Sequence, residues 1–141
     1  MSGTLPSYAD TSADPTVANQ ALCADLTLLF TLLITGLASI IAHIGGRPLA
    51  DQFEQQLNRF AAQHGWSVLT GLTDLNDLKQ RVPSVDAKIL LSVYRSYIAY
   101  ARTLAGQVLG EQMLKSVLLA LLNRLPARLA DLNRHYKIIV P

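Results

Sequence analysis

Residues 26–46, LTLLFTLLITGLASIIAHIGG, contain no Asp, Glu, Lys or Arg. Asp25 precedes this run and Arg47 follows it. An uncharged segment of this length leaves water, either for the hydrocarbon of a membrane or for the core of a protein. The fold therefore depends on which of the two surrounds it.

Both environments have support in the sequence. Twenty-one uncharged residues are enough to cross ~30 Å of hydrocarbon, and the basic residues that follow would place the C-terminal part in the cytoplasm and the N-terminus outside. The later helices, however, each carry an apolar face that needs a partner, and a central apolar helix would supply it. We therefore favour a buried helix in a cytoplasmic protein. A membrane-anchored protein with residues 26–46 as its single transmembrane helix is the alternative.

The rest of the chain has the pattern of an all-α protein. Residues 1–17 are rich in Ser, Thr, Pro and Asp and predict a flexible tail. Glycines and prolines then separate segments with the three- and four-residue apolar spacing of amphipathic helices. The predicted helices cover residues 18–44, 48–63, 73–82, 85–104, 110–124 and 126–134. Residues 136–141 predict a short extended tail, so the folded domain is expected over residues 18–135.

The second half of the chain resembles the first. Residues 44–57 align without gaps on residues 104–117, an offset of 60, with Gly46 opposite Gly106. In both halves a long helix is followed by a glycine break and an amphipathic helix. We therefore predict a helical bundle of two helix hairpins, with four main helices and short connecting helices.

Composition gives one domain with an uneven charge distribution. Half of the 141 residues are apolar and 16% are charged, below the usual ~25%. Residues 1–87 carry four basic and eight acidic side chains (net −4), and residues 88–141 carry eight basic and two acidic ones (net +6). This division indicates that the halves face each other or that the second half meets an anionic partner.

Motifs for catalysis are missing from the sequence. The three histidines are scattered, the single cysteine, Cys23, has no basic neighbour, and no nucleotide-binding or hydrolase motif occurs. We therefore expect no enzyme activity, no catalytic residue, no metal and no cofactor. No sequence signature of a known family is recognised.

Three groups of residues are candidates for binding. The first group consists of basic residues and predicts a ridge that binds an acidic partner or an anionic membrane surface. Nucleic acid is a less favoured partner, because the pI of about 8.9 is only mildly basic. The basic group comprises Lys88, Arg95, Arg102, Arg124 and Arg128. The leucine-rich segment 110–124 predicts an interface between copies or with a partner protein. Its members are Leu114, Leu118, Leu119 and Leu122. The third group, Tyr94, Tyr97, Thr31 and Thr35, is a candidate lining for a small-molecule pocket.

These patterns predict a non-enzymatic protein-interaction or regulatory module, such as a signalling accessory, that self-associates as a homo-oligomer. A small-molecule-binding sensor domain is a further alternative.

Overall fold

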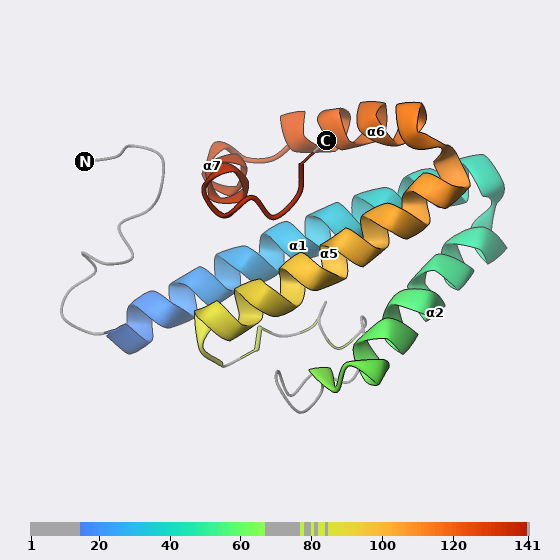
Figure 1. The fold of residues 1–141 in the computed structure, drawn as a ribbon. Coiled ribbons are helices and arrows are strands. Elements are labelled where there is room, and N and C mark those ends of the chain that lie inside the picture. The colour runs from blue at the N-terminus through green and yellow to red at the C-terminus, as the bar shows by residue number, and fades with distance from the viewer. Residues whose placement is uncertain (1–14, 67–76, 78–79, 81, 84, 141) are drawn as a thin grey trace.

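The computed structural model describes residues 15–66, 77, 80, 82–83 and 85–140, and over these residues the fold is all-α (Figure 1). The predicted fold class is confirmed. The helices are α1 (Pro15–Gly45), α2 (Arg47–Gln63), α5 (Ala87–Leu109), α6 (Glu111–Asn123) and α7 (Ala127–Tyr136). The predicted helix 73–82 lies largely outside the described residues, and so do residues 1–14 of the predicted tail. Residues 15–17, which the sequence pattern assigns to that tail, instead form the start of α1.

Helices α1 and α5 lie side by side and run in the same direction (Figure 1). Their starts are joined by Asn19, whose Nδ2 donates to the carbonyl of Val85 at 2.7 Å and whose Oδ1 accepts from the backbone N–H of Ala87 at 2.8 Å. Helix α5 begins after Asp86, whose side chain accepts from the N–H of Lys88. The helix therefore begins at Ala87, two residues later than the start of the predicted helix 85–104.

Each long helix ends at a glycine with the same backbone conformation. Gly46 has φ 87° and ψ 167°, and Gly110 has φ 83° and ψ 154°, a combination that only glycine adopts readily. The N–H of Gly46 donates to Ala42 and that of Gly110 to Gly106, both at 2.9 Å. At these corners the chain turns into α2 and α6, which leave on opposite sides of the α1–α5 pair (Figure 1).

The two halves therefore repeat one arrangement around an approximate twofold axis between α1 and α5. Helix α2 packs on α1 and also touches α5, while α6 packs on α5 and also touches α1. The equivalent glycines, Gly46 and Gly110, are 64 residues apart, one helical turn more than the offset of 60 taken from the sequence. A shift of one turn keeps apolar positions nearly on the same helix face, so the sequence pattern alone could not separate the two offsets.

The core lies mainly between α1 and α5. Leu26, Phe30, Ile34 and Leu37 of α1 are fully buried, and α1 contacts each of the other four helices. Helix α1 is nevertheless long and apolar enough to span a membrane, because it contains an 18-residue stretch with a mean hydropathy of 2.1, of which 33% is buried. One side of α1 is thus core, and the other faces outward without a charge.

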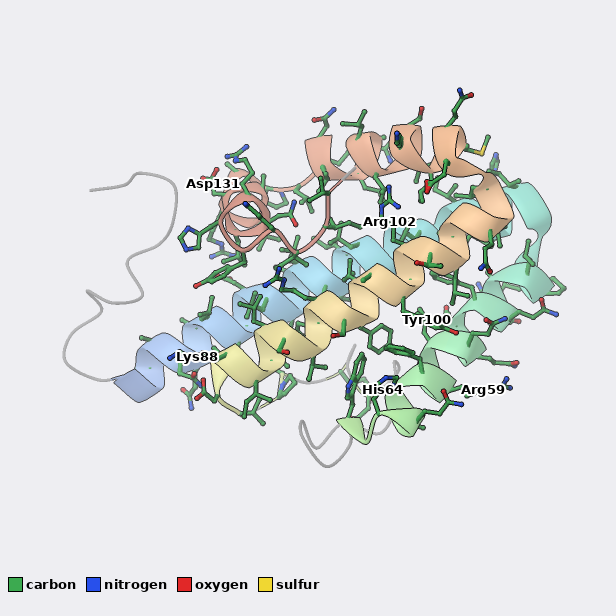
Figure 2. All side chains as sticks on the ribbon, in the orientation of Figure 1. Arg59, His64, Lys88, Tyr100, Arg102 and Asp131 are labelled. Atoms are coloured by element: carbon green, nitrogen blue, oxygen red, sulfur yellow. The ribbon has the colours of Figure 1, made fainter. Side chains whose placement is uncertain are left out.

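Aromatic rings join α2 to α5. Phe60 stacks on Tyr100 with ring centroids 4.2 Å apart, and Trp66 packs against both Phe60 and Tyr97. Figure 2 shows Tyr100 pointing from α5 towards α2. The return of Trp66 onto Phe60 after Gly65, which has φ 65°, is the contact that often follows a glycine helix end.

The last residues are part of the core. Asn133 of α7 accepts from the N–H of Ile139 at 2.9 Å and donates to its carbonyl at 3.0 Å. Ile138 and Ile139 are buried, and Arg102 donates to the carbonyl of Val140. The segment predicted as an extended tail is thus non-helical at residues 138–140 and held against the bundle.

Candidate functional site

The predicted basic ridge lies on the outward side of α5, but its members differ in their partners. Arg102 forms an ion pair with Glu111 at 3.5 Å. Among the residues that the structure describes, no carboxylate lies within ion-pair distance of Lys88 or Arg95. The available positive charge of the ridge is therefore concentrated in the first half of α5.

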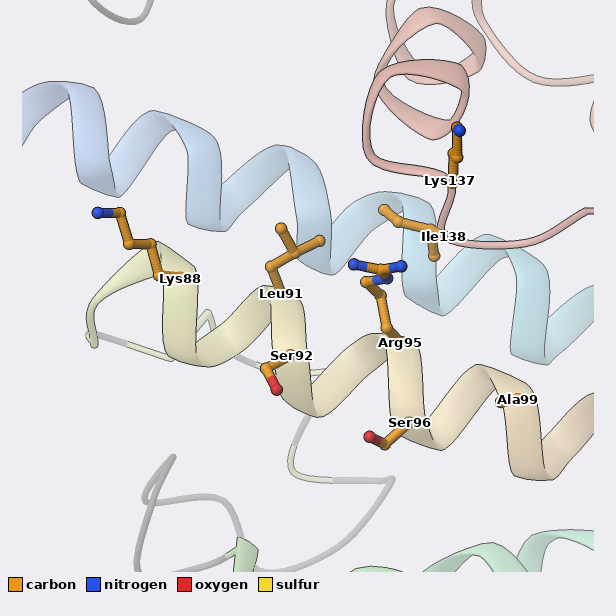
Figure 3. Close-up of a pocket in the computed structure, with 8 residues that line it drawn as sticks. All are labelled: Lys88, Leu91, Ser92, Arg95, Ser96, Ala99, Lys137 and Ile138. Carbon is orange, nitrogen blue, oxygen red and sulfur yellow. The ribbon is translucent and has the colours of Figure 1, made fainter.

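Lys88 and Arg95 line an open groove between α5 and the C-terminal segment (Figure 3). The groove has a volume of about 580 Å³. Leu91 and Ile138 provide apolar surface beside the cations, and Lys137 lines the groove on the opposite side, with its ammonium group directed away from α5 in Figure 3. The rest of its lining is small, Ser92, Ser96 and Ala99. We refer to this site as the cationic groove.

Lys137 has a backbone conformation that is unusual for its residue type. It caps the end of α7 with φ 52° and ψ 51°, and it is the one non-glycine residue with positive φ in the described part of the chain. Glycine is the common residue at this helix-end position, because a Cβ costs about 1 kcal/mol or more there. Lys137 lies in the segment 136–141 that the sequence pattern predicts as an extended tail, so it is not among the predicted ridge residues.

The other two predicted basic residues lie away from the groove. Arg128 of α7 pairs with Asp25 of α1, with the Nη2 and Oδ1 atoms 3.3 Å apart. This pair joins the acidic first half to the basic second half, one of the two arrangements that the charge division indicated. Arg124 caps the end of α6 through its backbone and is exposed.

The leucines of α6 divide between the core and the surface. Leu114 and Leu118 have no exposed surface and pack inside the chain, so they are not available to a partner in this structure. Leu122 is half-buried and packs against the core, and Leu119 is 51% exposed. Of the four predicted interface leucines, Leu119 is the one that faces fully outward.

The predicted tyrosine pocket is filled by the chain itself. Tyr94 is buried, stacks on Phe30 at 4.4 Å and hydrogen-bonds to the hydroxyl of Thr27 at 2.8 Å. Tyr97 packs edge-on against the same phenylalanine at 5.0 Å. Burial raises the pKa of Tyr94 well above its ordinary value, because the charged phenolate would lose its hydration.

The two threonines of that predicted pocket lie elsewhere. Thr31 is half-buried and Thr35 is exposed. Thr35 lines a separate hollow of about 250 Å³ between α1 and α2, together with Ser39, Arg47 and Glu54. Neither hollow described here is lined by Tyr94 or Tyr97.

The outward side of α1 contrasts with that of α5. Seven of its exposed residues, spaced three or four positions apart, form a stripe that we call the α1 outer face, and Gln20, His43, Ile44 and Gly45 of the same helix are exposed as well. The stripe comprises Val17, Ala21, Ala24, Leu28, Leu32, Thr35 and Ser39. When the two halves are aligned with an offset of 64 residues, Leu28 corresponds to Ser92 and Leu32 to Ser96. All four side chains are exposed. The α1 outer face could have been found from the sequence by comparing the halves in this register.

The thiol of Cys23 has a structural environment. It is buried, and its Sγ lies 3.3 Å from the carbonyl of Val85. Burial raises its pKa because the thiolate would be desolvated, which disfavours the reactive form. Within the described residues, no group of three His, Cys, Asp or Glu side chains is arranged to hold a metal ion.

No protein-family model, curated protein or solved structure matches the chain.

Proposed function

We propose that the protein is a non-enzymatic interaction module, of a regulatory type, that self-associates through the α1 outer face. The observation that carries this proposal is the difference between equivalent positions of the two halves. Leu28 and Leu32 are 43% and 40% exposed, whereas α5 has Ser92 and Ser96 in the same places. Folding does not require an apolar residue there, so the leucines indicate contact with another surface.

The charge pattern extends this contrast along both helices. In the register of 64 residues, the cations Lys88 and Arg95 of α5 take the places of Ala24 and Thr31 in α1. From Val17 to Gly45 the one ionised side chain of α1 is Asp25, and it is buried against Arg128. The side chains of the α1 outer face therefore carry no charge of their own, although its Thr35–Ser39 end shares a hollow with Arg47 and Glu54 of α2. Two such uncharged stripes can meet without repulsion, as a twofold dimer requires.

The side-chain sizes favour a second helix as the occupant of this face. Small residues, such as Ala21, Ala24 and Ser39, allow two helix backbones to approach closely, and Leu28 and Leu32 would fill the space between them. The stripe from Val17 to Ser39 is about 33 Å long at 1.5 Å per residue. We therefore propose α1 against α1 of a second copy, with a cytoplasmic location.

The test replaces the two leucines with the residues that the chain uses at the equivalent positions. Sedimentation equilibrium of the full chain should show a dimer, and Leu28→Ser with Leu32→Ser should weaken it at least tenfold, since two contacts of about 1 kcal/mol each are lost. Leu119→Ser is the control, because Leu119 is equally exposed on another helix. A monomeric unmodified chain at high concentration, or equal dissociation constants for all three proteins, would contradict the proposal.

A second candidate is membrane association through α1, supported by an 18-residue stretch of mean hydropathy 2.1 within a helix long enough to cross a bilayer. In that case the α1 outer face would meet acyl chains instead of a second copy. Flotation with neutral phosphatidylcholine vesicles separates the two. Flotation that is lost in the Leu28→Ser, Leu32→Ser variant supports the membrane candidate, and a soluble dimer that does not float supports self-association.

A further inference from the structure

We infer that the cationic groove binds an acidic peptide segment of a partner protein, independently of the α1 outer face. Lys88, Arg95 and Lys137 surround the groove, and no described carboxylate pairs with any of them. Elsewhere in the described chain, Arg47, Arg102, Arg128 and Arg134 each have an acidic partner, whereas Arg59, Lys115 and Arg124 have no described carboxylate within ion-pair distance and lie outside the groove. The groove is therefore a place where positive charge has been gathered and not neutralised internally.

The spacing of the cations suits an extended chain. Lys88 and Arg95 are seven residues apart on one helix and so lie about 10 Å apart along its axis. In the extended polyproline II conformation, which has three residues per turn, two side chains three residues apart lie on the same side of the peptide and are separated by about 9 Å. Acidic side chains with this spacing could face Lys88 and Arg95 together.

The surface between the cations is apolar. Leu91 and Ile138 lie between Lys88, Arg95 and Lys137 in Figure 3, and Ile138 is held there by the bonds of Asn133 to the next residue. An inorganic anion gains nothing from these two side chains, whereas a peptide with apolar residues between its acids would bury them. The open side of the groove also admits a continuing chain, which an enclosed small-molecule pocket would not.

Lys137 provides a second, independent observation. Its left-handed backbone conformation favours glycine, and yet the chain has a lysine there, with its side chain on the rim of the groove. Unfavourable backbone conformations that persist are concentrated at binding and catalytic sites. The lysine is thus better explained by its charge in the groove than by the stability of the turn.

The test uses fluorescence anisotropy with a labelled peptide that carries glutamates three residues apart and leucines between them. A matched peptide with glutamines in place of the glutamates is the first control. The glutamate peptide should bind and the glutamine peptide should not, and raising the salt concentration should weaken the binding. Equal binding of both peptides, or no binding of either, would overturn the inference.

Variants then locate the site. Arg95→Gln and Lys137→Gln should each weaken binding about threefold, and together about tenfold, as expected for exposed charge pairs. Lys115→Gln removes an exposed cation from α6, outside the groove, and should leave the affinity unchanged. If Arg95→Gln has no effect, or Lys115→Gln has the same effect, the groove is not the binding site.

Lys137→Gly separates binding from folding. Glycine relieves the backbone strain, so the midpoint of thermal unfolding should rise by about 3 °C while the peptide affinity falls about threefold. A residue with only a structural role would not give these opposite changes. Phosphatidylserine vesicles form the last arm. If they bind the chain in an Arg95-dependent way and the glutamate peptide does not bind, the ligand is a lipid surface and the peptide inference fails.

Discussion

The rings of Phe30 and Tyr94 stack face to face across the α1–α5 interface, with centroids 4.4 Å apart and planes 11° apart. The two residues occupy equivalent positions in the two halves of the chain, 64 residues apart. The approximate twofold axis therefore passes between them, and the same aromatic position is used twice to form one contact. The hydroxyl of Tyr94, which Phe30 lacks, forms a bond to Thr27 and makes this part of the core asymmetric.

Removing that hydroxyl tests the value of the asymmetric bond. Tyr94→Phe should lower the free energy of unfolding by about 1 kcal/mol, because the stacked ring remains and one buried hydrogen bond is lost. Urea denaturation followed by circular dichroism measures the change. Thr27→Val combined with Tyr94→Phe should cost less than the sum of the single variants, since both remove the same bond. Strict additivity would show that the two hydroxyls do not depend on each other.

Alkaline pH should destabilise the fold through Cys23. Burial raises the pKa of its thiol above the reference value of 9.0, so the native chain retains a proton that the unfolded chain releases. The contribution of Cys23 is therefore unaffected below about pH 9 and decreases above it, by up to about 1.4 kcal/mol per pH unit.

Urea midpoints at several pH values between neutral and strongly alkaline solution test this dependence. The matched variant is Cys23→Ala, because alanine is the residue at the equivalent position, Ala87. It should be less stable than the unmodified chain at neutral pH and should lose less stability as the pH rises. Parallel curves for the two proteins would be inconsistent with a buried, protonated thiol.

The two corner glycines should be equally sensitive to substitution. A Cβ at Gly110 would meet no atom within 4 Å, and one at Gly46 would meet only the Cδ of Pro48 at 3.6 Å. The cost of Gly46→Ala or Gly110→Ala thus comes from the backbone conformation and should be about 1–3 kcal/mol in each case. Thermal or urea unfolding of both variants measures it. A large difference between them would mean that the two corners are not equivalent.

Asn133 should be more important than its place in a terminal helix suggests. Asn133→Leu removes two hydrogen bonds to Ile139 and should lower the free energy of unfolding by about 2–4 kcal/mol. Amide hydrogen exchange is the more specific measurement, because the N–H of Ile139 should lose its protection before the helices do. Protection at Ile139 equal to that of the unmodified chain would show that packing alone holds the segment.

The helices were predictable because their boundaries are local. Gly46 ends α1 and Pro48 opens α2, and both signals act within a few residues. The end of α5 was predicted five residues early, at residue 104. Gly106 lies within a helix that continues to Leu109, where its small size leaves room for Leu114 of α6. That close approach is a tertiary contact, which a local pattern does not contain.

The candidate sites were less predictable, because they depend on which helix faces are covered. The spacing of Lys88 and Arg95 placed them on one face of α5, as the structure has them. The same reasoning could not show that Arg102 and Arg128 have acidic partners from other helices. Leu118 and Leu119 are adjacent in sequence and alike in chemistry, and only the packing of α6 on α5 buries one and exposes the other.

The aromatic contacts between α2 and α5 give the molecule an internal optical probe. Trp66 is the single tryptophan, and its indole centroid lies 4.8 Å from that of Tyr97 and 5.9 Å from that of His64. Its emission therefore reports whether α2 is docked on α5, separately from the total helix content. Detachment of α2 while the long helices stay paired would shift the emission to longer wavelength and leave the far-ultraviolet circular dichroism almost unchanged.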